Sequence, residues 1–202
     1  KPEDVLAAQN FNAIRNWLYL DMAVYGRYNA IAWSYMKEKG IEPKIEDGDM
    51  EILKGGDPDF IAFNYYSTAT VKESKIDDSE GKFIGGDQQI ATGDLGVFNG
   101  AHNDFLEKTE FGWEIDPVGF RTTLREIYGR YNLPLIVTEN GLGAYDNLED
   151  GDTINDDYRI DYLRKHIKAM DDAINVDGVD LMGYTPWGCI DLVRSEEHTS
   201  EL

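Results

Sequence analysis

Three short apolar runs of the sequence each end in side chains that can bind or transform a polar ligand. Asn64 and Tyr66 follow the first run, Glu139 follows the second, and Trp187 follows the third. In parallel α/β sheets and barrels, ligands bind at the edge where the strands have their carboxyl ends. The pattern therefore predicts one site formed by residues that lie far apart in the sequence.

Glu139 is the sharpest candidate for catalysis, because it directly follows the run Leu135-Ile-Val-Thr138 and precedes the pair Asn140-Gly141. A carboxylate at the rim of a sheet can act as a nucleophile or as a general base. In the alternative interpretation, Asn140-Gly141 simply turns the chain and Glu139 is an incidental charge at the rim. The spacing alone leaves both interpretations open.

The other candidates also have structural alternatives. Asn64 could end its strand as a cap, and Tyr65 and Tyr66 could be aromatic residues of the core. Trp187 stands between Pro186 and Gly188, where its ring could stack on the face of a sugar or fill the core. The residue types permit a binding site without requiring one.

Helix-type and strand-type patterns alternate along the chain, which predicts an α/β fold with a parallel sheet. Asp116 is the expected N-cap of a helix over Pro117–Arg130. The expected apolar stripe of the last helix consists of Leu163, Ile167, Met170 and Ile174. The predicted strands are Asp59–Asn64, Leu135–Thr138 and Val179–Thr185, and the predicted helices are Val5–Leu20, Tyr25–Lys39, Pro117–Arg130 and Asp157–Ile174.

Two long polar segments interrupt these elements. The segment Ser74–Asp104 contains six glycines, and it is either a surface excursion or a wall over an active site. The acidic segment Asp146–Asp157 does not match an EF-hand, so we expect a solvated face. His102, His166 and Cys189 lack the spacing of a zinc site, so neither a metal nor a cofactor is expected.

Composition excludes several classes of partner. The 202 residues carry 19 Lys and Arg against 39 Asp and Glu, a net charge of -20, so nucleic acid and anionic membranes would repel the protein. The longest apolar stretch, Leu181–Ile190, is too short to span a membrane. A single cysteine, Cys189, excludes an internal disulfide and favours the cytoplasm. The sequence does not determine the oligomeric state.

Four segments together resemble glycoside hydrolase family 1. The resemblance runs from near Lys1 to about Val193. The sequence from Trp187 to Asp191 is similar to that of the 6-phospho-β-glucosidase branch. The four segments are Asp59-Phe-Ile-Ala-Phe-Asn-Tyr-Tyr66, Phe111-Gly-Trp-Glu-Ile-Asp-Pro117, Val137-Thr-Glu-Asn-Gly141 and Gly183-Tyr-Thr-Pro-Trp-Gly-Cys-Ile-Asp191.

The resemblance implies the C-terminal half of a (β/α)8 barrel and a retaining glycosidase that needs no cofactor. It would make Glu139 the nucleophile and Tyr66 the residue that orients it. Asn64 would lie in the subsite of the cleaved sugar, and Trp187 would pack against the sugar ring. The partner implied is a small sugar or sugar phosphate. The alternatives are a plain β-glucosidase or β-galactosidase, and a noncatalytic sugar-binding barrel.

The sequence departs from the family pattern at both ends. A retaining glycosidase needs a second carboxyl as acid/base, and the family carries it in an Asn-Glu-Pro motif that Lys1-Pro-Glu-Asp4 does not match. We therefore expect a fragment of the barrel over residues 1–193 that is inactive by itself. Residues 194–202 resemble a translated sequencing adapter and are expected to be non-native; the alternative is a hydrophilic C-terminal tail. Arg194 stands where the phospho branch has a serine.

Overall fold

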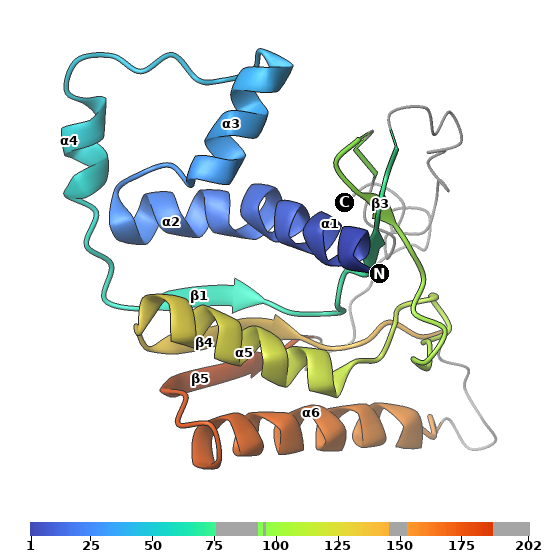
Figure 1. Ribbon diagram of the computed structural model, residues 1–202. Helices are drawn as coiled ribbons and strands as arrows, with labels where there is room; N and C mark the ends of the chain where they lie inside the picture. The colour runs from blue at the N-terminus through green and yellow to red at the C-terminus, as the bar shows by residue number, and fades with distance from the viewer. Residues whose placement is uncertain (76–92, 95, 146–152, 188–202) are drawn as a thin grey trace. The chain divides into compact units, whose positions relative to one another are not determined.

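The computed structural model describes residues 1–75, 93, 94, 96–145 and 153–187 (Figure 1). Two compact units divide the chain. The described part of the first unit comprises residues 1–59, 69–75, 93–94 and 96–102, and that of the second comprises residues 60–68, 103–145 and 153–187. The expected tail at 194–202, together with Cys189, lies outside the described residues, as does most of the predicted acidic segment.

The first unit is mainly helical. Its helices are α1 (Pro2–Asn12), a π-helical turn η1 (Ala13–Trp17), α2 (Leu18–Tyr25), α3 (Ala30–Lys39) and α4 (Asp49–Lys54). Strands β2 (Val71–Lys72) and β3 (Asn99–Gly100) pair antiparallel. The helix expected over Val5–Leu20 is confirmed within α1, η1 and α2.

The single helix predicted over Tyr25–Lys39 is wrong in its first turn. Helix α2 ends at Tyr25, and its C-cap Gly26 adopts φ +60°. A Cβ at Gly26 would lie 2.5 Å from the Cα of Lys54. Helix α3 then begins anew, because the side chain of Asn29 accepts hydrogen bonds from the backbone amides of Ile31 and Ala32. The close approach of α4, which the sequence pattern did not predict, requires glycine at this point.

The second unit contains a parallel sheet in the order β1-β4-β5. Its strands are β1 (Ile61–Asn64), β4 (Leu135–Asn140) and β5 (Leu181–Pro186). Leu135 and Val137 in the central strand are fully buried, whereas the intervening Ile136 is only half-buried. The three predicted strands are confirmed, and β4 extends two residues further than expected.

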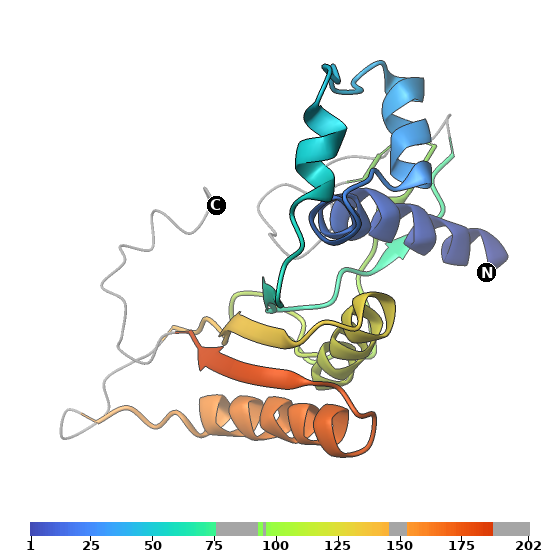
Figure 2. The ribbon, with the colours of Figure 1, turned by 90° about the vertical axis from the view of Figure 1, so that its left-hand side faces the viewer.

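Helices α5 (Pro117–Tyr131) and α6 (Asp157–Asn175) contact each other and lie beside this sheet (Figures 1 and 2). The expected cap of α5 is confirmed, since the backbone amide of Gly119 donates to Oδ1 of Asp116 at 2.8 Å. Pro117 at the first helical position has no amide that needs a partner. The large side chains that α5 buries are Phe120, Leu124, Ile127 and Tyr131.

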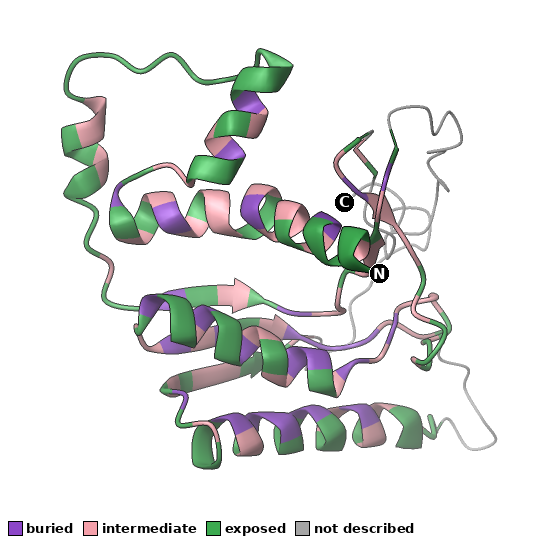
Figure 3. Cartoon of the chain, viewed as in Figure 1, coloured by how far each residue is buried: buried purple, intermediate pink, exposed green. Residues whose placement is uncertain are grey.

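The buried side of α6 differs from the predicted stripe. Met170 is buried as expected, but Ile167 is 51% exposed and Ile174 is 41% exposed. The residues that face the sheet and α5 instead are Tyr162, His166, Ala169, Met170 and Ala173 (Figure 3). Aromatic and small side chains take this side because α6 packs closely on the rings that follow β1 and line α5.

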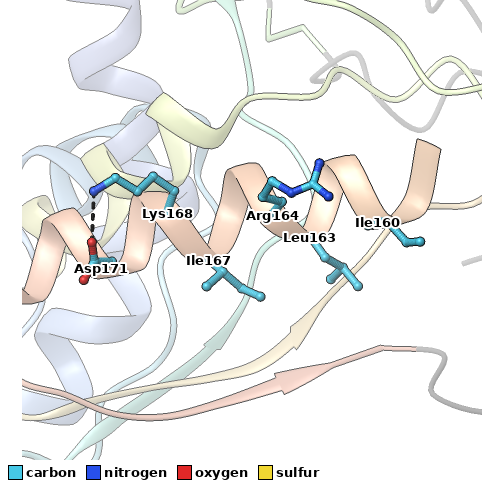
Figure 4. A pocket seen from close by; sticks show the side chains of 6 residues that line it. All are labelled: Ile160, Leu163, Arg164, Ile167, Lys168 and Asp171. Atoms are coloured by element: carbon cyan, nitrogen blue, oxygen red, sulfur yellow. Dashed lines mark hydrogen bonds and ion pairs between the residues drawn. The ribbon is translucent and has the colours of Figure 1, made fainter. Parts of the chain in front are cut away.

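A second apolar strip runs along a more exposed side of α6. Ile160, Leu163 and Ile167 point to the same side of the helix and line a shallow hollow (Figure 4). Arg164 lies beside them, and Lys168 forms an ion pair with Asp171 at 2.9 Å. Helix α6 therefore has two apolar sides, and the sequence pattern alone did not distinguish the buried one.

His166 is a fully buried titratable residue of α6, on the side that packs against α5. Its ring stacks on Tyr162 with centroids 3.9 Å apart and lies 5.6 Å from the centroid of Phe120. Nδ1 lies 2.9 Å from the carbonyl oxygen of Tyr162, so Nδ1 carries the proton and donates. Nε2 is buried and has no hydrogen-bond partner among the described residues.

This environment predicts a pH dependence of folding stability. Burial lowers the pKa of His166, so below about pH 6.5 the unfolded chain binds a proton that the folded chain resists. The free energy of unfolding should therefore keep its full value above that pH and should decrease below it. The decrease is about 1.4 kcal/mol per unit of difference between the unfolded and the folded pKa of His166. Urea titrations of the wild-type protein and H166L at pH 7.5 and 5.5 test this. The decrease should be smaller in H166L, and equal decreases would refute the assignment.

Candidate functional site

The sheet register places Asn64 directly beside Glu139. The two residues are partners in the β1–β4 ladder, after an irregularity between Phe63 and Asn64. The backbone amide of Tyr65 donates to the carbonyl oxygen of Glu139 at 2.9 Å. The ends of β1 and β4 therefore meet at the same edge, as the strand pattern predicted.

Tyr66 and Glu139 form the central contact of the site. The hydroxyl of Tyr66 donates to Oε2 of Glu139 at 2.7 Å, and both side chains are half-buried. Burial and, to a smaller extent, the hydrogen bond to Glu139 raise the pKa of Tyr66. The phenol therefore stays protonated and donates its hydrogen bond to the carboxylate. Tyr66 donates its one hydrogen bond to Oε2 and leaves Oε1 of Glu139 without a bond from the phenol.

Trp187 is brought to the same edge by the end of β5. Its backbone amide donates to the carbonyl oxygen of Asn140 at 2.9 Å, and its ring lies edge-on to Tyr66 with centroids 5.9 Å apart. Gly141 permits this approach, because a Cβ there would lie 2.9 Å from the carbonyl oxygen of Trp187. The Asn-Gly pair thus serves close packing between two strand ends.

The side chain of Asn64 is exposed and bonds to the neighbouring strand. Its Oδ1 accepts a hydrogen bond from the hydroxyl of Thr138 at 2.6 Å. The fold therefore brings Asn64 next to Glu139, while the hydrogen bond of its side chain goes to Thr138. Tyr65 instead is buried, as the alternative interpretation of that residue predicted.

Trp113 is a site residue that the sequence reasoning did not single out. Its ring lies edge-on to Tyr66 with centroids 5.5 Å apart, and Phe111 packs beside it at 6.1 Å. The rings of Trp113 and Trp187 thus both lie edge-on to Tyr66. The signal in the sequence is the segment Phe111-Gly-Trp113, which carries part of the family resemblance.

Two further carboxylates of this unit, Glu114 and Asp116, are buried. Each accepts a hydrogen bond from a backbone amide. Glu114 accepts from the amide of Asn103, and Asp116 accepts from the amide of Gly119, each at 2.8 Å. Among the described residues, no cluster of three or more His, Cys, Asp or Glu side chains could hold a metal. No described helix combines the length and apolar character that crossing a bilayer requires.

The arrangement is suited to a polar ligand that has apolar faces. Glu139 offers a carboxylate oriented by Tyr66, Trp113 and Trp187 offer aromatic surfaces, and Asn64 offers an amide at the next strand end. Sugars have this mixture of hydroxyl groups and CH faces. A carboxylate so placed can attack an electrophilic carbon or bind a hydroxyl group.

Comparison with known proteins identifies similar chains. A family model described as glycosyl hydrolase family 1 matches residues 1–201. An aryl-phospho-β-D-glucosidase of Bacillus subtilis, BglC, is 43% identical over all of this chain, which covers 46% of that relative. The 6-phospho-β-glucosidase AscB of Escherichia coli is 42% identical over 96% of this chain and 38% of its own. The chain thus spans less than half the length of these relatives.

Solved structures agree with this comparison. A family 1 β-glucosidase from Thermotoga maritima matches with a TM-score of 0.75 and 30% identity, over 93% of this chain and 37% of that protein. The same enzyme has been solved in complex with isofagomine lactam, with similar values. The predicted fold class is confirmed, since the chain folds as a portion of an α/β barrel.

Proposed function

The chain belongs to glycosyl hydrolase family 1, and from this membership we propose that it is part of a retaining β-glycosidase with Glu139 as nucleophile. The observation that carries the proposal is the hydrogen bond of 2.7 Å from Tyr66 to Oε2 of Glu139 at the sheet edge. A carboxylate oriented in this way can form a covalent glycosyl-enzyme.

In the proposed reaction, Oε1 of Glu139 attacks the anomeric carbon while the bond from that carbon to the leaving oxygen breaks. A second carboxyl group protonates the leaving oxygen and then takes a proton from the water that hydrolyses the ester. We assign this second carboxyl to a part of the whole enzyme outside this segment, because the Asn-Glu-Pro motif that carries it in the family is not matched here.

Asn64, Trp113 and Trp187 would bind the substrate. Asn64 lies beside Glu139 in the register and can bond a hydroxyl group of the cleaved sugar. The rings of Trp187 and Trp113, which both lie edge-on to Tyr66, can pack on CH faces of the sugar and of the leaving group.

For the substrate, we propose a 6-phosphorylated β-glucoside, hydrolysed in the cytoplasm. Relatives at 42–43% identity are named phospho-β-glucosidases, whereas the solved β-glucosidase is 30% identical. The location follows the expectation from the single cysteine.

The test uses the full-length protein with 4-nitrophenyl β-glucoside and its 6-phosphate. We expect kcat/KM to be at least about 100-fold higher for the phosphorylated substrate, since paired phosphate contacts contribute several kcal/mol. Proton NMR of the first product should show the β-anomer, because two displacements retain configuration. Preference for the free glucoside would indicate a plain β-glucosidase, and an α-anomer as first product would refute the covalent mechanism. Binding without turnover would indicate a noncatalytic barrel.

Replacement of Tyr66 by Phe tests the orienting hydrogen bond. A hydrogen bond to a charged group contributes about 1.5–3 kcal/mol, so we expect kcat to fall roughly ten- to 150-fold in Y66F, with KM changed much less. Steady-state rates of the full-length protein on the aryl glucoside measure this effect.

Tyr65 supplies the matched control for Y66F. Its hydroxyl donates to the carbonyl oxygen of Asp116 at 2.8 Å and contacts Thr68, away from Glu139. Y65F loses a buried phenol in the same turn, so it should lower the melting temperature and leave kcat within about threefold. If the two variants lose the same activity, Tyr66 has no special role toward Glu139.

A further inference from the structure

Asn140 is the fully buried neighbour of the proposed nucleophile, and its side chain contacts three different elements. Its exposed fraction is 0%. Nδ2 donates to the carbonyl oxygen of Tyr65 at 2.8 Å and to the hydroxyl of Tyr162 at 2.9 Å. Oδ1 accepts from the hydroxyl of Tyr184 at 2.9 Å. The amide thus joins the turn after β1, helix α6 and strand β5 to the end of β4.

The orientation of this amide is determined by its partners. The carbonyl oxygen of Tyr65 can only accept, so the nitrogen of Asn140 must face it. Both amide hydrogens and the amide oxygen then have partners, so every polar atom of this buried amide is hydrogen-bonded. No isosteric residue reproduces this set, because Asp lacks the donors and Leu lacks all polar atoms.

The bond to Tyr65 acts directly on the position of Tyr66. The backbone of Tyr65 is held on both sides, since its amide donates to the carbonyl oxygen of Glu139 and its carbonyl accepts from Asn140. That carbonyl belongs to the peptide group that joins Tyr65 to Tyr66. Its orientation therefore sets where the phenol of Tyr66 reaches, and that phenol lies 2.7 Å from Oε2 of Glu139.

On its other side, Asn140 supports Trp187. Its backbone carbonyl accepts from the amide of Trp187, and its Oδ1 accepts from Tyr184 in the preceding strand. The two neighbours of Glu139 that we assign to orientation and binding, Tyr66 and Trp187, thus share one buried anchor.

We propose that Asn140 is a positioning residue, whose side-chain amide holds Tyr66 within hydrogen-bond distance of Glu139. This inference rests on the proposed function, in which Glu139 is the nucleophile. Asn140 does not touch the substrate and acts through the peptide group between Tyr65 and Tyr66. Loss of the two amide donors of Asn140 should lower kcat, because small misplacements of reacting groups slow catalysis strongly.

The test compares N140A, N140D and Y184F in the full-length protein. N140A and N140D remove the donors to Tyr65, so kcat should fall at least about tenfold while KM changes less than about threefold. Y184F removes only the bond to Oδ1 and should keep kcat within about threefold. At low pH, the carboxyl group introduced in N140D becomes protonated and gains one donor, so the activity of N140D relative to wild type should rise as the pH falls.

Asn29 provides a control for general destabilisation. It lies in the first unit, caps α3 and donates to the buried Asp21 at 2.8 Å. N29A therefore removes the same side chain and a comparable set of hydrogen bonds far from the proposed chemistry in the sequence. It should lower the melting temperature without lowering kcat. If N29A and N140A lose the same activity, Asn140 only stabilises the fold.

Crystal structures separate this inference from the proposed function. In N140A, the distance from Oη of Tyr66 to Oε2 of Glu139 should exceed about 3.5 Å, beyond hydrogen-bond reach, whether or not Glu139 is the nucleophile. An unchanged distance would overturn the positioning role. Normal activity of E139Q together with a displaced Tyr66 in N140A would overturn the proposed function and leave the positioning of Tyr66 by Asn140 established.

Discussion

Replacement of Glu139 by Gln in the full-length protein is expected to lower kcat by at least about four orders of magnitude. An amide cannot form the glycosyl ester, whereas its oxygen can still accept the hydrogen bond that Tyr66 donates at 2.7 Å to the wild-type carboxylate. Folding should therefore persist, and the melting temperature should change little. Release of 4-nitrophenol measures the activity, and circular dichroism measures the fold.

Glu110 offers a control for the same chemical change. It is exposed, and its Oε2 accepts a hydrogen bond from the backbone amide of Tyr145 at 2.6 Å. E110Q should therefore retain kcat within about threefold. Substantial turnover by E139Q would remove Glu139 from the mechanism.

A rescue experiment identifies the role of Glu139 more specifically. In E139A, added azide can occupy the space of the carboxylate and attack the anomeric carbon in a single displacement. Turnover of a 2,4-dinitrophenyl glycoside should then return, and the product should be the α-glycosyl azide. A β-glycosyl azide would mean that azide enters on the other face of the sugar, where the proposed acid/base acts.

The second large effect concerns the 202-residue chain by itself, which is expected to have no detectable glycosidase activity. A retaining glycosidase needs two carboxyl groups roughly 5–5.5 Å apart, and we assign only Glu139 to this segment. The described sheet has three strands, and β5 at its margin carries the 54% exposed Met182. Such open margins favour association between chains over a closed barrel.

The measurement is hydrolysis of the aryl glucosides by the purified chain, with the E139Q form of the same chain as the blank for host enzymes. Coexpression with the upstream portion of a full-length relative such as BglC tests whether the missing half restores turnover. Hydrolysis by the chain alone, above the blank, would contradict both the expected inactivity and the assignment of the acid/base to another segment.

Local sequence patterns predicted the elements that carry the site. Alternating strand and helix signals predicted β1, β4 and β5, and Asp116 correctly marked the start of α5. These features depend on residues close in sequence, such as a cap and its amide or an apolar run. The same reasoning was wrong at Gly26, where the approach of Lys54 from α4 ends a helix.

The partners of the site residues depended on the tertiary structure. Trp113 beside Tyr66 and the inward position of His166 were not evident from the pattern. On α6, two apolar sides satisfied the same helical periodicity. Packing against α5 and the rings after β1 selected which side is buried.

The sequence by itself determined that a carboxylate, an amide and two aromatic residues stand at the ends of three strands, because strand patterns and residue types are local properties. The tertiary structure decided which of these groups touch. Tyr66 reaches Glu139, while Asn64 bonds to Thr138, and Asn140 holds the turn between them. These contacts depend on the register of parallel strands and its irregularities beside Asn64 and Asn140. A shift of one residue turns side chains to the opposite face of a sheet, so no local pattern could have specified them.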